Sequence, residues 1–194
     1  MDRQYAPLPI RELGAGAGFC RPTQAVPTRV TLESPALHAM TDLARVSPAT
    51  IRPQAPLAGA NQFMIARGVR LLLVVDEHDA ILGVITATDI LGERPMQAAI
   101  GRGLRRDDLS VADVMTPAAQ VEVIGLAEVE ASRVGHVLET LRRLGRQHAL
   151  VADADNMVRG IFSISQIARQ LGVTLPSGGE VARTFSEIEA ALAR

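Results

Sequence analysis

The sequence contains few of the residues on which several classes of protein depend. Cys20 is the only cysteine in the 194-residue chain, so neither an internal disulfide nor a thiolate metal cluster is possible. Aromatic residues make up 3% of the sequence and tryptophan is absent, which argues against a stacking platform for nucleic-acid bases. The formal net charge of −1 also lacks the basic excess typical of nucleic-acid-binding proteins. We therefore expect no nucleic-acid partner.

The sequence also lacks the features of a secreted or membrane protein. No apolar run approaches the roughly 20 residues that a membrane-spanning helix needs. The N-terminus, MDRQYAPLPI, has no basic region followed by an apolar run, so it differs from a secretory signal. We expect a cytoplasmic protein with no membrane partner. Its 194 residues suffice for one sizeable core or for two small units that share one.

The most informative feature of the sequence is a long internal repeat. Residues 68–91, GVRLLLVVDEHDAILGVITATDIL, recur without a gap as residues 145–168, GRQHALVADADNMVRGIFSISQIA. The apolar positions, the turn aspartate (Asp76 and Asp153), a glycine and a hydroxyl residue all coincide. A fixed offset with matching turn residues indicates duplication of one supersecondary unit.

The repeated unit is predicted to alternate strands and helices. Residues 69–75 form an apolar run of strand length, residues 76–79 a polar turn, and residues 81–85 a second strand. Upstream, residues 50–52 are expected to form a short strand, and the apolar spacing from residue 57 predicts a helix that ends at Gly68. The two strands around the turn should form an antiparallel hairpin, and the strand–helix–strand part a right-handed parallel crossover. Two such units should pack together, because one alone exposes an apolar sheet face.

Segments outside the repeat are less regular. Ser34 followed by Pro35 is typical of a helix start, and residues 36–43 are expected to form a short helix or turn. In the connection between the copies, residues 96–100 are expected to be helical. Residues 125–133 have no counterpart in the first unit, and the sequence assigns them no purpose.

The second unit and the C-terminus show clear periodicity. Residues 121–124 alternate as a strand, and residues 134–144 carry an apolar stripe at helical spacing. Ser177 and Glu180 have capping-box spacing. The apolar positions of residues 181–192 then mark one face of a helix that packs on the module or across a dimer interface.

The motifs of the repeat resemble those of a CBS domain. The resemblance rests on VMTP at residues 114–117, on apolar strands that end in VVD or VAD, and on G-h-h-T-x-x-D-h at residues 83–90. The AMT of residues 39–41 echoes VMT in the first copy. Two such domains in tandem resemble the arrangement called a Bateman module, and the resemblance covers about residues 36–172.

The resemblance implies an α/β (α+β) fold with two CBS units of β-α-β-β-α order, packed as a pseudo-twofold pair. An N-terminal extension and a C-terminal helix flank the pair. The predicted divisions are an extension at 1–35, the first CBS unit at 36–92, a linker at 93–109, the second CBS unit at 110–172 and a C-terminal helix at 173–194.

The resemblance also implies a function. CBS pairs are regulatory rather than enzymatic, and they often bind AMP, ADP, ATP or S-adenosylmethionine. They commonly form dimers and act on an effector protein, so we expect a homodimer, an effector on another chain and no required cofactor. We predict no catalytic residue and no metal site: the four histidines are scattered and no nucleophile motif is present.

The resemblance assigns the first ligand site. Asp89 matches the aspartate that accepts hydrogen bonds from both ribose hydroxyls, a task for which a two-oxygen acceptor is suited. Thr86 matches the residue whose hydroxyl contacts ribose or phosphate, and Arg70 a phosphate-binding position. Without the resemblance, Thr86 and Asp89 are better explained as helix caps. The predicted nucleotide-binding residues are Arg70, Ile85, Thr86, Thr88, Asp89, Val121 and Val123.

The second copy departs from the pattern. Gln166 replaces the aspartate and Gln147 replaces Arg70, and a neutral amide binds a hydroxyl more weakly than a carboxylate does. The predicted weaker second site consists of Thr50, Ile51, Arg146, Gln147, His148, Ser163 and Gln166. Because this copy is degenerate, the alternative to a sensor is a ligand-free dimerisation or protein-docking module.

Overall fold

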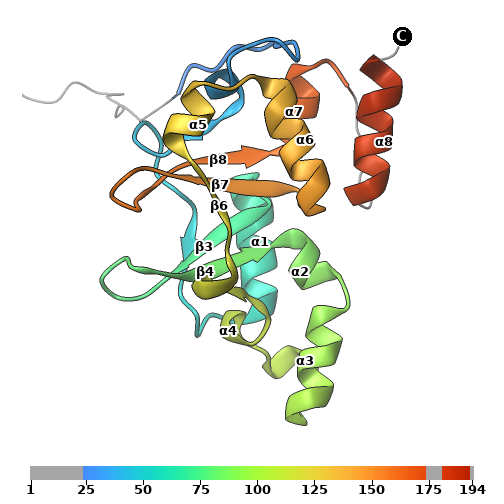
Figure 1. Ribbon diagram of the computed structural model, residues 1–194. Helices are drawn as coiled ribbons and strands as arrows, with labels where there is room; N and C mark the ends of the chain where they lie inside the picture. Colours follow the sequence, from blue (N-terminus) through green and yellow to red (C-terminus); the bar gives the residue numbers. More distant parts are fainter. Residues whose placement is uncertain (1–23, 174–180, 193–194) are drawn as a thin grey trace, which may run out of the picture.

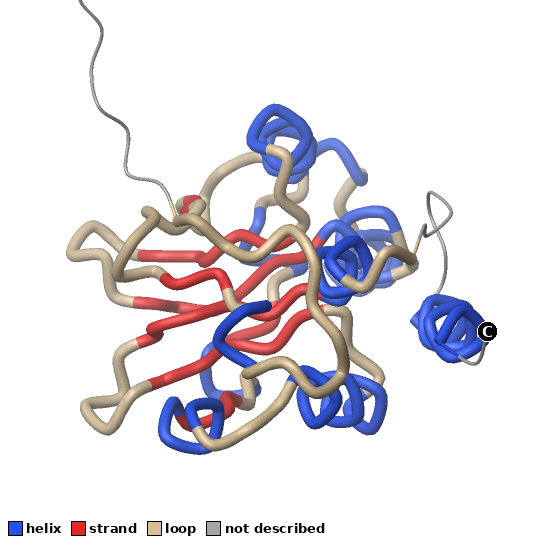
Figure 2. The backbone as a smooth tube through the Cα atoms, turned by 90° about the horizontal axis from the view of Figure 1, so that it is seen from above, coloured by secondary structure: helices blue, strands red, loops and turns tan. Residues whose placement is uncertain are grey.

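The computed structural model of the protein describes residues 24–173 and 181–192. Its two four-stranded sheets are stacked, with helices on their outer faces (Figures 1 and 2). Ser177 and Glu180, predicted to form a capping box, lie outside the described residues. No helix in the described ranges is long and apolar enough to cross a membrane.

The sheet of the first unit has the strand order β2-β3-β4-β5. As predicted, β2 and β3 are parallel and flank a helix, whereas β3 and β4 form an antiparallel hairpin. The elements of this unit are β2 (Thr50–Ile51), α1 (Leu57–Arg67), β3 (Leu71–Val75), β4 (Ile81–Thr86), α2 (Ala87–Leu91) and β5 (Thr116–Pro117).

The second unit repeats this arrangement in the order β1-β8-β7-β6. Its first two central strands are again parallel across a helical connection, and the next two again form a hairpin. The extra residues 125–133 supply a short helix, α5. The elements are β1 (Thr41–Asp42), β6 (Val123–Gly125), α5 (Leu126–Glu130), α6 (Val134–Leu144), β7 (His148–Ala152), β8 (Val158–Ser163) and α7 (Ile164–Gln170).

Each sheet takes one edge strand from the segment that leads into the other unit. β5 precedes the second unit in sequence, yet Thr116 pairs with Val84 of β4 in the first. β1 precedes the first unit, yet Thr41 pairs with Ile161 of β8 in the second. These two edge strands connect the units by backbone hydrogen bonds. They also place Thr41 and Thr116, the threonines of the AMT and VMT motifs, at equivalent positions of the two sheets.

The predicted linker contains much of the remaining structure. The helix expected at residues 96–100 is longer, and it projects from the first unit (Figure 1). Pro95 is its only fully buried residue, whereas Met96 and Ile100 are 67% and 76% exposed. The remaining elements are η1 (Ala36–Ala39), α3 (Arg94–Arg102), η2 (Arg106–Asp108), α4 (Val111–Val114), η3 (Ala118–Gln120) and α8 (Val181–Leu192).

The helix start predicted at Ser34 is wrong in its detail. The short helix η1 begins after Pro35 with no side-chain cap. The Ser34 hydroxyl instead accepts a hydrogen bond from the backbone N–H of Thr31 at 2.9 Å. The hydroxyl therefore stabilises the preceding turn, which is the other local use of a serine side chain.

Both hairpin turns are built from the same local hydrogen bonds. The Asp76 carboxylate accepts from the N–H groups of His78 and Ala80, each at 2.9 Å. The carboxylate of Asp153 accepts from the two equivalent N–H groups. Such carboxylate–backbone bonds are the reason aspartate favours turns, so the predicted turns are confirmed.

The two units share a core, as their exposed apolar sheet faces required. Leu71, Leu73 and Val84 of the first unit pack with Leu150 of the second in one buried cluster. Phe185 and Ile188 of α8 are 7% and 2% exposed and join the core of the second unit. Of the two packings predicted for the C-terminal helix, on the module or across a dimer interface, the structure shows the first.

Candidate functional site

A cavity of about 330 Å³ lies where the end of β4 and the start of α2 face the second unit. We call it the first cavity. Thr86, Thr88 and Asp89 form one wall, and residues 120–122 and 145–148 form the opposite wall. The remaining lining residues are Leu71, Val84, Arg94, Thr116 and Leu150.

Asp89 is held in the first cavity by a capping box at the start of α2. Its Oδ2 accepts hydrogen bonds from the backbone N–H of Thr86 at 2.8 Å and from the Thr86 hydroxyl at 2.7 Å. The Thr86 hydroxyl oxygen in turn accepts from the N–H of Asp89 at 3.2 Å. Thr86 and Asp89 therefore do form a helix cap. The cap orients Asp89, and its Oδ1 takes no part in the capping bonds.

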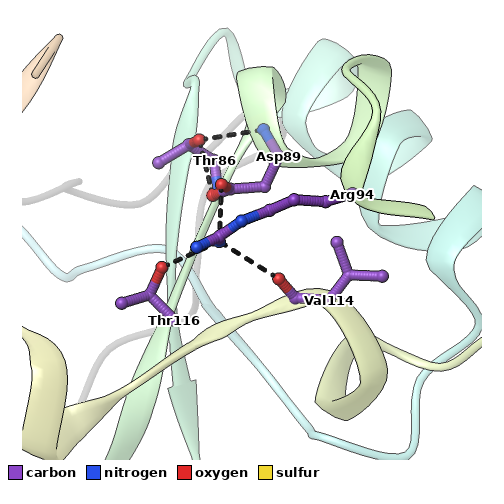
Figure 3. Close-up of polar contacts among 5 residues, drawn as sticks. All are labelled: Thr86, Asp89, Arg94, Val114 and Thr116. Atoms are coloured by element: carbon purple, nitrogen blue, oxygen red, sulfur yellow. Dashed lines mark hydrogen bonds and ion pairs between the residues drawn. The ribbon is translucent and has the colours of Figure 1, made fainter. Parts of the chain in front are cut away.

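Arg94, which the sequence analysis missed, binds the other carboxylate oxygen. Its Nη1 donates to Asp89 Oδ1 at 2.8 Å, to the Thr116 hydroxyl at 3.0 Å and to the Val114 carbonyl at 3.3 Å (Figure 3). Arg94 is the first residue of α3, and its side chain remains 46% exposed. The sequence showed only that an arginine follows Asp89 by five residues. The turn between α2 and α3 brings the side chain of this arginine to the cavity, and the sequence did not predict that turn.

The opposite wall of the first cavity is also polar. Arg146 forms an ion pair with Glu122 at 3.0 Å, with both side chains partly exposed. The Thr88 hydroxyl lies 3.4 Å from the Gln147 side-chain oxygen, a long hydrogen bond between the units. The two arginines of this cavity, Arg94 and Arg146, are therefore each matched by a carboxylate.

A second cavity, of about 310 Å³, lies at the equivalent junction of the second unit. Ser163, Ser165 and Gln166 form one wall, in the positions that Thr86, Thr88 and Asp89 occupy in the first cavity. The other lining residues are Thr41, Leu43, Val46, Ser47, Pro48, Ala49, Gly68, Val69, Arg70, Leu71, His148, Ile161 and Arg169.

The structure changes how the predicted site residues are grouped. Arg70 lines the second cavity, not the first, whereas Arg146 and Gln147 line the first. His148 lines both. The physical reason is the pseudo-twofold packing: the residues that precede the hairpin of one unit face the strand–helix junction of the other.

Four other predicted residues line neither cavity. Ile85 is fully buried in the core of the first unit, and Val123 is 46% exposed outside the first cavity. Thr50 and Ile51 form β2 and follow residues 46–49, which do line the second cavity. The cavities are thus lined by the residues just before β2 and β6, including the predicted Val121, and not by the residues of β2 and β6.

Gln166 uses its side chain within the second unit. Its Oε1 accepts a hydrogen bond from the Thr41 hydroxyl at 3.1 Å, and its amide nitrogen donates to the Ala39 carbonyl at 3.3 Å. At the position of the Asp89 carboxylate, the second unit thus has a neutral amide whose oxygen and nitrogen both have partners within that unit.

His148 occupies the wall shared by the two cavities, opposite Ser163 in the hairpin of the second unit. Burial, together with the smaller effect of the positive charge of Arg70, lowers the pKa of His148 to about 4. The ring is therefore neutral at pH 7.

We expect His148 to make the protein less stable in mild acid. In the unfolded chain the ring takes up a proton near pH 6.5, but in the folded protein only near pH 4. The free energy of unfolding should fall by about 2 kcal/mol between pH 7.5 and pH 5 because the unfolded state binds more protons there. Urea denaturation at both pH values, compared with His148→Leu, measures this contribution. Equal pH dependence in the two proteins would contradict it.

No metal centre accompanies these cavities. Within residues 24–173 and 181–192, no group of three or more histidine, cysteine, aspartate or glutamate side chains is placed to hold a metal ion.

Two duplicated units with a cavity at each junction define a paired-domain architecture. Comparison with known proteins agrees with this architecture. The family model of the CBS domain matches residues 40–95. No curated protein sequence matches the chain. Residues 40–95 thus match a CBS domain, and the chain as a whole has the fold of a solved CBS-domain pair.

Three solved structures illustrate the similarity of fold. An uncharacterized conserved protein from Pyrococcus horikoshii is 21% identical with a TM-score of 0.56, over 77% of this chain and 100% of that chain. CBSX2 in complex with AMP is 20% identical with a TM-score of 0.51, over 71% and 94%. The CBS domain pair of protein MJ0100, in complex with 5′-methylthioadenosine and S-adenosyl-L-methionine, is 21% identical with a TM-score of 0.51, over 73% and 98%.

Proposed function

We propose that the protein is a non-enzymatic regulatory module that binds an adenosine-type ligand in the first cavity. The candidate ligands are AMP, ADP, ATP and S-adenosylmethionine, and no cofactor is required. We further propose that it acts in the cytoplasm as a homodimer and signals to an effector protein on another chain.

The observation that carries this proposal is the arrangement of Asp89. Its backbone and one carboxylate oxygen are fixed by the capping box with Thr86, while Oδ1 is bound, among the residues that the structure describes, only to the partly exposed Arg94. A fixed carboxylate can accept hydrogen bonds from the two hydroxyls of a ribose. The cavity volume of about 330 Å³ lies within the range of small-ligand pockets. Structures of the same fold contain AMP or S-adenosyl-L-methionine, which supports this ligand class.

Arg94 couples ligand binding at the proposed site to the position of α3. A ribose hydroxyl that donates to Asp89 Oδ1 competes with the hydrogen bond that Arg94 now donates. The released guanidinium is then available to a phosphate, for which its fork of donors is suited. Since Arg94 is the first residue of α3, this exchange would shift the position of a helix that has little buried contact. The exposed apolar residues of α3 are where we expect an effector to sense the change.

A ligand panel tests the proposed function. AMP, ADP, ATP and S-adenosylmethionine are each added to the full chain, and the melting temperature is recorded, with GMP as a base-specificity control. A ligand present at 100 times its Kd stabilises the native state by about 2.7 kcal/mol. For a chain of this size we expect a rise of roughly 5–10 °C. If no adenosine compound raises the melting temperature, the sensor proposal is wrong.

The second candidate is a ligand-free docking or dimerisation module. Two observations favour it: both oxygens of Asp89 already have partners, and α3 exposes Met96 and Ile100. Exposed apolar groups on one helix are typical of interaction surfaces. This alternative predicts a stable dimer, measured by sedimentation, that is unaffected by the ligand panel and by Asp89→Ala. A monomer at micromolar concentration would argue strongly against it.

A further inference from the structure

The first and second cavities share a wall. Leu71 and His148 are the two residues that line both of them. They hold equivalent positions of the repeat, because each is the first residue of the strand that leads into a hairpin, β3 in the first unit and β7 in the second. Each also lies opposite the hydroxyl residue of its own hairpin, Thr86 for Leu71 and Ser163 for His148. The shared wall thus consists of one aliphatic side chain and one imidazole.

The imidazole of His148 has hydrogen-bonding capacity that the fold leaves unused. Neither ring nitrogen has a hydrogen-bond partner among the residues that the structure describes. In the same part of the chain, the buried side-chain atoms that lack a partner belong to Arg159 and Gln170, not to His148. The ring nitrogens are therefore within reach of a molecule in the cavities that the ring lines.

The surroundings keep the ring of His148 neutral. The positive charge of Arg70 in the second cavity disfavours a second proton, as burial does. The first cavity offers no unpaired carboxylate to hold an imidazolium, because Asp89 is paired with Arg94 and Glu122 with Arg146. The lining of the second cavity contains no aspartate or glutamate. At pH 7 the ring therefore carries a single proton, on one nitrogen or the other.

This single proton makes the two nitrogens of His148 dependent on each other. In a neutral imidazole one nitrogen donates and the other accepts. A group that accepts a hydrogen bond from one nitrogen fixes the proton there, and the other nitrogen can then only accept. A group that donates to one nitrogen has the opposite effect. Leu71, at the equivalent position, has no such property.

We propose that His148 couples the occupancy of the two cavities: a hydrogen bond from a ligand in the first cavity fixes the position of the ring proton, and this changes how well the second cavity holds a hydrogen-bonding group. Coupling between two sites is reciprocal, so a group held in the second cavity changes the affinity of the first by the same factor. The inference rests on the proposed function, because it requires an adenosine-type ligand in the first cavity.

Nitrogen-15 NMR of the histidine rings tests the first step. Protonated and unprotonated ring nitrogens have well-separated chemical shifts, so the spectrum reports the position of the proton. His148→Leu, which repeats the residue found at position 71, identifies the signals of this ring. His78→Leu is the matched control, because His78 is an exposed histidine that lines neither cavity. Circular dichroism confirms that each variant is folded.

We expect saturating adenosine to move the His148 signals toward one tautomer and to leave the other histidines unchanged. His148→Leu should weaken adenosine binding about fivefold, since one neutral hydrogen bond is lost. His78→Leu should leave the affinity unchanged. Asp89→Asn should remove the shift of the His148 signals at the same adenosine concentration, because the ligand then no longer occupies the first cavity.

An alkylated cysteine in the second cavity tests the second step without a second ligand. Ser165 lines this cavity. Ser165→Cys is combined with Cys20→Ser, so that iodoacetamide attaches one neutral amide group there. Methyl methanethiosulfonate, which attaches an apolar methylthio group, is the control. We expect the amide to change the Kd for adenosine at least about fivefold when His148 is present. The methylthio group should leave the Kd unchanged, and His148→Leu should remove the effect of the amide.

Two results would overturn the proposal while the proposed function stands. One is that adenosine binds in an Asp89-dependent manner but does not move the His148 signals. The other is that the amide at Ser165→Cys has no effect on adenosine binding, or the same effect with His148 and in the His148→Leu variant. Failure of the proposed function has a different signature: adenosine does not bind, or its affinity is the same in Asp89→Asn, and both proposals then fail together.

Discussion

Asp89→Asn is expected to weaken AMP binding about 100-fold. The substitution keeps the shape of the side chain but removes the charge that strengthens two hydrogen bonds to ribose, each contributing about 1.5 kcal/mol. It also weakens the capping box with Thr86 and the contact with Arg94, at a cost of about 1 kcal/mol in the free energy of unfolding. Calorimetric titration and urea denaturation measure the two effects separately.

The chain offers a closely matched control at Asp113. This residue forms the same capping box, with the N–H and hydroxyl of Ser110 each at 2.8 Å from Oδ2, at the start of α4. It also pairs with an arginine of α3, Arg102, but it lines neither cavity. Asp113→Asn should therefore cost a similar amount of stability and leave AMP binding intact. Equal losses of affinity in the two variants would show that Asp89 acts only through the stability of its helix.

Gly83→Ala is expected to reduce the free energy of unfolding by about 3 kcal/mol. A Cβ at this position of β4 would collide with the backbone carbonyl oxygen of Thr116 and lie 3.2 Å from the Cα of Pro117. Neither backbone atom can move without breaking the β4–β5 pairing. Because Thr116 also binds Arg94, ligand affinity in the first cavity should fall as well. Chemical denaturation gives the stability, and titration with AMP gives the affinity.

The equivalent glycine of the second unit provides the comparison. A Cβ at Gly160 would have three side-chain atoms of Met40 as its nearest neighbours, where Gly83 has backbone atoms. Methionine has several flexible torsions and adapts to small changes of space, so Gly160→Ala should cost only about 1 kcal/mol. A loss as large as that of Gly83→Ala would mean that the side chain of Met40, which is 2% exposed, cannot move.

Much of the fold could be predicted because it depends on local interactions. The hairpins follow from apolar runs around Asp76 and Asp153, whose carboxylates bond to backbone N–H groups within four residues. The helix ends at Gly68 and Gly145 follow from their left-handed backbone, with φ of 64° and 60°, which glycine adopts without strain. The edge strands β1 and β5 were not predicted, because each is two residues long and pairs with a strand of the other unit.

The candidate site could be predicted only within each unit. Thr86 and Asp89 are three residues apart, so their contact and their place at a strand–helix junction follow from the sequence. Arg94 was missed because it lies in the predicted linker, and only the turn between α2 and α3 returns it to Asp89. The residues that face this junction from the other unit depend on how the two units pack. The repeat in the sequence gives no information about that packing.

Residue identities alone indicate that the protein is a duplication of one β-α-β-β-α unit, and that the two copies differ at Asp89 and Gln166. These conclusions rest on residue identity and short-range hydrogen bonding. The packing of the two units places Arg70 in the second cavity and Arg146 and Gln147 in the first, which no pattern in the sequence indicated. The physical reason is that the shared apolar core packs the units about a pseudo-twofold axis, so that each cavity combines the capping box or amide of one unit with the charges of the other.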